Sequence, residues 1–64
     1  MLNTLNEFIN RVETLKDIGD AYYIFEDGCT EELRDLIYDL APDDEQEHGE
    51  PFRYAMHVLG FESY

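Results

Sequence analysis

The stretch TLNEFINRVETL, residues 4–15, carries the clearest structural pattern in this 64-residue chain. Its apolar residues recur every three or four positions and so share one helical face: Leu5, Phe8, Ile9, Val12 and Leu15. Thr4 followed three residues later by Glu7 is a capping-box pattern, which is typical of a helix start. Gly19 is a natural stop. The sequence therefore predicts a helix over residues 4–17.

The next stretch, DAYYIFEDG at residues 20–28, fits two structures. Its aromatic and β-branched residues have strand propensity. A strand needs a partner, however, and the chain offers no second strand, so this structure requires pairing with another copy. Asp20 can instead cap a two-turn helix that turns Ala21, Ile24 and Phe25 inward. We favour the short helix, and an α+β fold with a strand at residues 21–26 paired in a homodimer is the alternative.

A further helix is predicted from Thr30 to Ala41. Thr30 is a suitable N-cap, and Glu31 and Glu32 fall in the first turn, where the helix dipole favours negative charge. The apolar stripe of this segment consists of Leu33, Leu36, Ile37 and Leu40. Pro42 ends the helix.

Residues 42–51, PDDEQEHGEP, are predicted to form a loop before a last helix. Pro51 suits the first helical position, and Gly60 suits the end. The apolar residues between them again repeat every three or four positions: Phe52, Ala55, Met56 and Leu59. We therefore expect an all-α fold, a small helical bundle of three main helices and one short helix, in a single domain over residues 1–64.

Net charge is the unusual feature of the composition. Sixteen Asp and Glu stand against four Lys and Arg, which gives a net charge of −12. Residues 17–50 hold thirteen of these acids and a single basic residue of the Lys/Arg type, Arg34, so the entire excess lies there. Because 44% of residues are apolar, we expect a folded domain and not a disordered acidic tail.

Cellular location follows from what the sequence lacks. The one cysteine, Cys29, excludes an internal disulfide, which fits a reducing compartment. The first residues have no basic region followed by an apolar run, as a signal peptide does, and no apolar stretch approaches the roughly 20 residues of a membrane span. We expect a soluble protein in the cytoplasm of a host cell.

Metal and cofactor sites are not indicated by the spacing of the candidate ligands. An EF-hand loop starting at Asp43 would place His48 where glycine is needed and Tyr54 where a bidentate Glu is needed. Cys29, His48 and His57 lack zinc-site spacing. No cofactor is expected.

Catalysis is equally unsupported. The only serine, Ser63, adjoins the C-terminal residue, and Cys29 has no evident base beside it. The chain also has no glycine-rich phosphate loop, and no serine at a helix start as an acyl carrier needs. We expect a protein that is not an enzyme.

The acidic residues themselves are the candidate functional site. On the Thr30–Ala41 helix, Glu31, Glu32, Asp35 and Asp39 fall opposite the leucine stripe, with neighbours about 5–6 Å apart. Further acids extend this field on either side along the chain: Asp43, Asp44, Glu45, Glu47, Asp20, Glu26 and Asp27. Tyr38, Tyr22 and Tyr23 are candidate interface anchors or core aromatics. Phosphates would be repelled, so the expected partner is a basic protein and not a nucleic acid.

With its short length, its charge of −12 and its acidic rows at residues 31–39 and 43–47, the chain resembles the small acidic nucleic-acid-mimic proteins of phages and mobile elements. That group includes anti-CRISPR and anti-restriction proteins. The resemblance is one of charge and size, without an aligned motif. It implies a protein that occupies the nucleic-acid-binding cleft of a host defence nuclease, with carboxylates in place of phosphates.

Two alternatives remain open from the sequence. The first is an acidic interaction module that does not mimic nucleic acid, such as an antitoxin, an immunity-type inhibitor or an adaptor. The second is that the charge only keeps a small protein soluble. Solubility alone does not explain the absence of lysine from residues 17–50.

Overall fold

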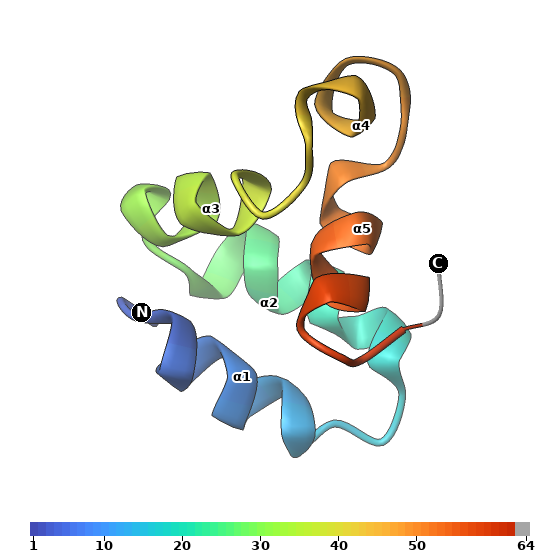
Figure 1. The fold of residues 1–64 in the computed structure, drawn as a ribbon. Coiled ribbons are helices and arrows are strands. Elements are labelled where there is room, and N and C mark those ends of the chain that lie inside the picture. Colours follow the sequence, from blue (N-terminus) through green and yellow to red (C-terminus); the bar gives the residue numbers. More distant parts are fainter. Residues whose placement is uncertain (63–64) are drawn as a thin grey trace. The chain divides into compact units, whose positions relative to one another are not determined.

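The computed structural model describes residues 1–62, and these residues are all-α (Figure 1). The elements in chain order are α1 (Leu5–Glu13), the 3-10 helix η1 (Ile18–Asp20), α2 (Ala21–Gly28), α3 (Glu31–Tyr38), α4 (Asp43–His48) and α5 (Pro51–Val58). The chain divides into two compact units, Met1–Arg34 and Asp35–Tyr64, and α3 contributes residues to both. The all-α prediction is confirmed, with more and shorter helices than expected.

Helix α1 begins as its sequence predicts, with a complete capping box. The Glu7 backbone N–H donates to Thr4 Oγ1 at 3.2 Å, and the Thr4 backbone N–H donates to Glu7 Oε1 at 3.0 Å. A further hydrogen bond from the Asn3 N–H, together with those from Thr4, lowers the pKa of the Glu7 carboxyl. Phe8 and Val12 are buried, which confirms the apolar face.

The predicted end of this helix is wrong, because α1 stops at Glu13. The Thr14 hydroxyl donates back to the Arg11 carbonyl at 2.7 Å, and the Leu15 N–H bonds three residues back, to Val12, at 3.0 Å. Such bonds tighten the last turn and end the helix. Gly19 is not a helix stop but lies inside η1, where its N–H donates to the Asp17 carboxylate at 2.9 Å.

Helix α2 occupies the stretch with two candidate structures, so the alternative strand at residues 21–26 is wrong. Ala21 and Phe25 are buried, as the helical spacing predicts. Asp20 precedes the helix, but its side chain makes no capping hydrogen bond. The sole β-type pairing among residues 1–62 is a parallel bridge between Leu2 and Cys29.

Helix α3 has a narrower buried stripe than predicted. Leu33 and Ile37 are buried and Leu40 is half-buried, but Leu36 is 48% exposed. Leu36 was expected in the core, and that prediction is wrong, because the Leu36 side chain lies at the edge of the buried face. The helix ends at Tyr38 and not at Ala41, since the N–H of Ala41 bonds only three residues back, to Tyr38, at 3.1 Å.

Helix α4 replaces the loop predicted at residues 42–51. Pro42 is its N-cap residue, and Asp43, Asp44 and Glu45 fill its first turn, where the helix dipole favours negative charge. No residue of α4 is buried. The acid-rich composition suggested a loop, but the same acids at a helix start are compatible with a short helix.

Helix α5 follows its prediction closely. Pro51 opens it, and Ala55 and Met56 are buried. Gly60 has a φ of 90°, its N–H bonds to the His57 carbonyl at 3.0 Å, and the Phe61 N–H bonds to the Met56 carbonyl at 2.9 Å. This pair of bonds is a Schellman motif, which satisfies the last carbonyls of the helix.

Two glycine substitutions should change stability in opposite directions. Gly60→Ala should destabilise by about 1–2 kcal/mol, because alanine resists a positive φ even though an added Cβ meets nothing within 4 Å. Gly28→Ala should stabilise by about 0.5 kcal/mol, because Gly28 is helical and an added Cβ makes an ordinary 3.5 Å contact with Ile24. Urea unfolding followed by circular dichroism measures both. A neutral Gly60→Ala would mean that the left-handed cap is not required.

Candidate acidic interaction surface

The outer face of α3 carries a row of carboxylates. Glu31, Glu32 and Asp35 are exposed, and Asp39 continues the row because its N–H still makes a helical bond to the Asp35 carbonyl at 3.0 Å. Residues three and four apart on a helix lie about 5–6 Å apart, so these four acids, the α3 row, form one strip. The buried Leu33 and Ile37 face away from it.

The two ends of the α3 row differ in their energetics. The start is well formed, since the Leu33 N–H donates to Thr30 Oγ1 at 3.3 Å and confirms Thr30 as the cap. Glu31 and Glu32 there gain from the helix dipole. Asp35 and Asp39 lie toward the C-terminal end, where negative charge is disfavoured by about 0.3–1 kcal/mol and no basic residue compensates within the last turn. The fold does not benefit from this half of the row.

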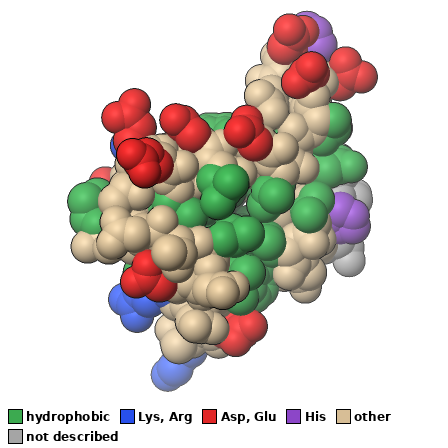
Figure 2. Space-filling view, turned by 60° about the vertical axis from the view of Figure 1, so that its left-hand side comes forward, with side chains coloured by type: hydrophobic (Ala, Val, Ile, Leu, Met, Phe, Trp, Pro, Cys, Tyr) green, Lys and Arg blue, Asp and Glu red, His purple; other side chains and the backbone are tan. Residues whose placement is uncertain are grey.

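Helix α4 carries a second group of acids. Asp43, Asp44 and Glu47 are exposed and Glu45 is half-buried. In Figure 2 several red acidic side chains lie beside a purple histidine, as the sequence of α4 places its acids beside His48. His48 Nε2 lies 3.5 Å from a Glu47 carboxylate oxygen. These acids therefore sit on a helix and not on the loop that the sequence suggested.

Gln46 connects α4 to the end of α3, and sequence reasoning missed it. Its side-chain amide donates to the carbonyl oxygens of Tyr38, at 3.1 Å, and Ala41, at 2.8 Å. The Tyr38 carbonyl also accepts from the Ala41 N–H, so the amide adds a second hydrogen bond at the end of α3 and one to the carbonyl of the following turn. The one signal in the sequence was an uncharged residue amid five acids. The contact holds α4 beside the turn that carries Asp39.

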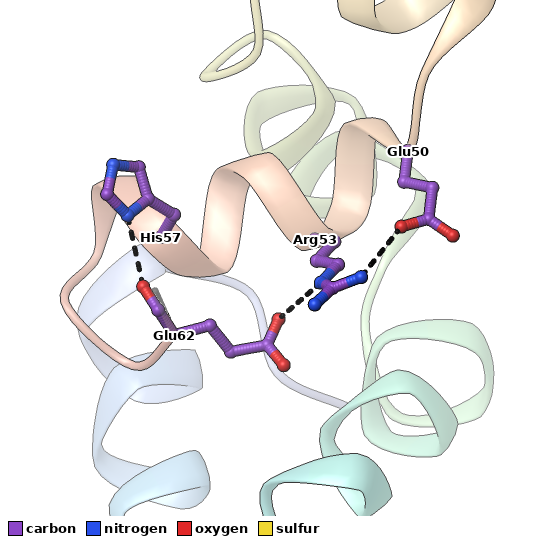
Figure 3. Close-up of polar contacts among 4 residues, drawn as sticks. All are labelled: Glu50, Arg53, His57 and Glu62. Carbon is purple, nitrogen blue, oxygen red and sulfur yellow. Dashed lines mark hydrogen bonds and ion pairs between the residues drawn. The ribbon is translucent and has the colours of Figure 1, made fainter. Parts of the chain in front are cut away.

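Arg53 forms ion pairs with carboxylates that do not belong to the α3 row. Arg53 lies between two carboxylates, 3.3 Å from Glu50 and 4.0 Å from Glu62 (Figure 3). In the same region His57 Nδ1 makes a 3.0 Å hydrogen bond with the Glu62 carbonyl. The Arg53 pairs and the His48–Glu47 contact do not involve any acid of the α3 row.

Arg34, the one Lys or Arg in the acidic middle, is half-buried and does not form an ion pair among the described residues. Its guanidinium Nη1 donates to the backbone carbonyl of Glu26 at 3.4 Å. The α3 row is thus not neutralised by any ion pair within residues 1–62.

The remaining candidate residues lie in separate parts of the chain. Asp20, Glu26 and Asp27 are exposed and belong to the first unit, around α2. Tyr38 is 36% exposed and belongs to the second. The structure thus groups the candidates into the α3 row, the α4 acids and an α2 group.

The next question is whether the described residues include a metal site or a reactive nucleophile. Among residues 1–62, no three His, Cys, Asp or Glu side chains converge as a metal site. Cys29 is fully buried, and burial raises the pKa of its thiol although Arg34 opposes the shift. Ser63 lies outside the described residues. None of the described helices combines the length and the apolar character that a membrane crossing requires.

Comparisons of the chain with protein-family models, with curated proteins and with solved structures find no match. A function for this chain has to be inferred from its own surface. That surface is dominated by carboxylates on three helices, most of which make no ion pair among residues 1–62.

Proposed function

We propose that this protein is a non-enzymatic inhibitor that occupies the basic nucleic-acid-binding cleft of a host defence nuclease, in the manner of anti-CRISPR and other nucleic-acid mimics. The observation that supports the proposal best is the α3 row: four carboxylates in one strip, of which Glu31, Glu32 and Asp35 are exposed and none is used in an ion pair among residues 1–62. The protein acts in the cytoplasm of the host cell, without metal or cofactor.

Electrostatics explain how such a surface inhibits. A cleft that binds phosphates presents Arg and Lys side chains, and guanidinium groups bind carboxylates bidentately as they bind phosphates. The net charge of −12 attracts this cleft over distance and speeds encounter. The row is held on a capped helix, so its backbone needs little ordering on binding. Nucleic acid and inhibitor then compete for the same groups.

One observation favours a second candidate function, an acidic interaction module that does not mimic nucleic acid. Leu36 is 48% exposed at the edge of the α3 row. An apolar side chain beside carboxylates suits a protein surface that also offers an apolar contact, as the partner of an antitoxin or an adaptor does.

Displacement by nucleic acid distinguishes the two functions. The immobilised protein is exposed to host lysate at low salt, and bound proteins are eluted with duplex DNA or with RNA at constant ionic strength. We expect nucleic acid to release the partner, and the partner to lose its nucleic-acid binding as this protein is added. Raising salt should weaken the complex, because screening acts over about 8 Å at physiological ionic strength.

A partner that keeps its nucleic acid while bound would contradict the mimic and favour the interaction module. A protein that captures no nucleic-acid-binding partner under these conditions would contradict both the mimic and its cleft target.

A further inference from the structure

The outer face of α2 exposes two adjacent tyrosines. Tyr23 is 67% exposed and Tyr22 is 45% exposed, whereas Ala21 and Phe25 are buried. Tyr22 lies at the edge of the exposed face, since its ring centroid is 6.2 Å from that of the buried Phe25. The two tyrosine rings meet edge to face, with centroids 6.5 Å apart and planes inclined by 72°. Exposure of this much aromatic surface is informative, because rings of this size are usually more buried.

Carboxylates accompany both rings on the helix surface. Glu26 lies four residues after Tyr22 and three after Tyr23, and Asp27 lies four after Tyr23. This spacing places the Cβ atom of each tyrosine about 5–6 Å from that of a carboxylate-bearing residue on the same face. Asp20, three residues before Tyr23, adds another exposed acid. The face therefore alternates aromatic rings and negative charges within residues 20–27, the α2 face.

This combination fits one side chain best. A guanidinium group stacks its plane on an aromatic ring while its N–H groups bind a carboxylate bidentately. The lysine ammonium is a compact and strongly hydrated charge that gains less from the ring. The Glu26 carboxylate is not used in an ion pair among residues 1–62. Arg34 donates to the Glu26 backbone carbonyl and not to its carboxylate.

We propose that the α2 face binds arginine side chains of the basic partner, with Tyr22 and Tyr23 as stacking platforms and Glu26 and Asp27 as carboxylate acceptors. This inference rests on the proposed function, in that it assumes a basic partner, and it adds that the partner presents arginine and not only positive charge.

Charge complementarity favours an arginine-bearing partner over a second copy of the chain, a nucleic acid or an apolar protein surface. A second copy of the chain carries the same net charge of −12 and would be repelled. A nucleic acid could stack its bases on the rings, but its phosphates would be repelled by the carboxylates. An apolar surface would have to desolvate the exposed carboxylates of Glu26 and Asp27 without pairing them. An arginine-bearing segment pairs the carboxylates and covers the rings together.

Binding of an oligoarginine peptide and of an oligolysine peptide of equal length, measured by calorimetry at about 0.15 M salt, tests the inference. The wild type should bind oligoarginine about five- to tenfold more tightly, as expected for ring stacking at an exposed site. In Tyr22→Leu/Tyr23→Leu this preference should fall to about twofold or less, while oligolysine binding is unchanged because the carboxylates remain. Glu26→Gln/Asp27→Asn should weaken both peptides.

Tyr54→Leu is the matched control, since Tyr54 is half-buried on α5 and lies against the His57 ring. It should keep the preference for arginine, and circular dichroism should show that each variant is folded. Equal binding of the two peptides by the wild type would overturn the arginine inference while leaving carboxylate recognition intact. Binding of neither peptide would overturn the inference together with its assumption of a basic partner.

Discussion

Reversing Glu32, Asp35 and Asp39 to lysine should abolish binding to the basic partner and leave the helix folded. All three side chains are exposed, and the triple reversal shifts the net charge from −12 by six units. A reversed row repels a basic cleft at the positions where the wild type attracts it. We expect a loss of at least about 100-fold in affinity, which corresponds to about 2.7 kcal/mol.

The fold should tolerate this reversal for two reasons. The three lysines repel one another no more than the three acids did, and the remaining Glu31 gains an opposite charge four residues later, at position 35. Lysine at positions 35 and 39 also interacts favourably with the C-terminal end of the helix dipole, where aspartate does not. Thermal unfolding by circular dichroism should therefore show a melting temperature equal to the wild type or higher.

A control with three lysines at another place tests whether the position of the charge matters. Asn6→Lys/Asn10→Lys/Glu13→Lys places three lysines on the exposed face of α1, away from the α3 row in sequence, and shifts the charge by four units. This variant should retain most of the inhibition of nucleic-acid binding. If both variants lose inhibition alike, net charge alone is responsible, and if both retain it, the α3 row is not the contact surface.

Local patterns were sufficient to predict where most helices begin. Thr4 with Glu7, Thr30 with Leu33, and Pro51 each act within a single turn, so the capping chemistry is visible in a few adjacent residues. The Schellman motif at Gly60 is equally local. These elements formed as predicted because their hydrogen bonds join residues no more than five apart.

Hydrogen bonds from side chains to the backbone of a preceding helix or turn explain what the patterns missed. Helix α4 has no buried residue, and the amide of Gln46 holds it by reaching carbonyls five and eight residues back. The contact between Arg34 and the Glu26 carbonyl likewise spans eight residues. No local periodicity encodes such bonds, so α4 was predicted as a loop.

The candidate site was predictable in part. Acids opposite an apolar stripe are expected to be exposed, and the acids of the α3 row within α3 are. Leu36 was assigned to the stripe because it has the right spacing, yet in an eight-residue helix the buried face holds only Leu33 and Ile37. Spacing alone does not give the width of a buried face.

Phe25→Ala should leave the protein marginally stable or unfolded at room temperature. Phe25 is 1% exposed, and replacing a buried phenylalanine by alanine costs about 3–5 kcal/mol. A chain of 64 residues is expected to have about 3–10 kcal/mol of stability in total. The substitution therefore removes a large part or all of it, and the melting temperature should fall by more than about 12 °C where a transition remains.

Tyr23→Ala on the same helix is the control, since Tyr23 is 67% exposed and an exposed helical position gains little from its side chain. It should change the free energy of unfolding by less than about 1 kcal/mol, as measured by urea titration. Equal losses in the two variants would mean that the inner and outer faces of α2 are not distinguished as the structure has them. A stable Tyr23→Ala that also loses the preference for oligoarginine would separate the two roles of α2, because Phe25 then supports the fold while Tyr23 serves the partner.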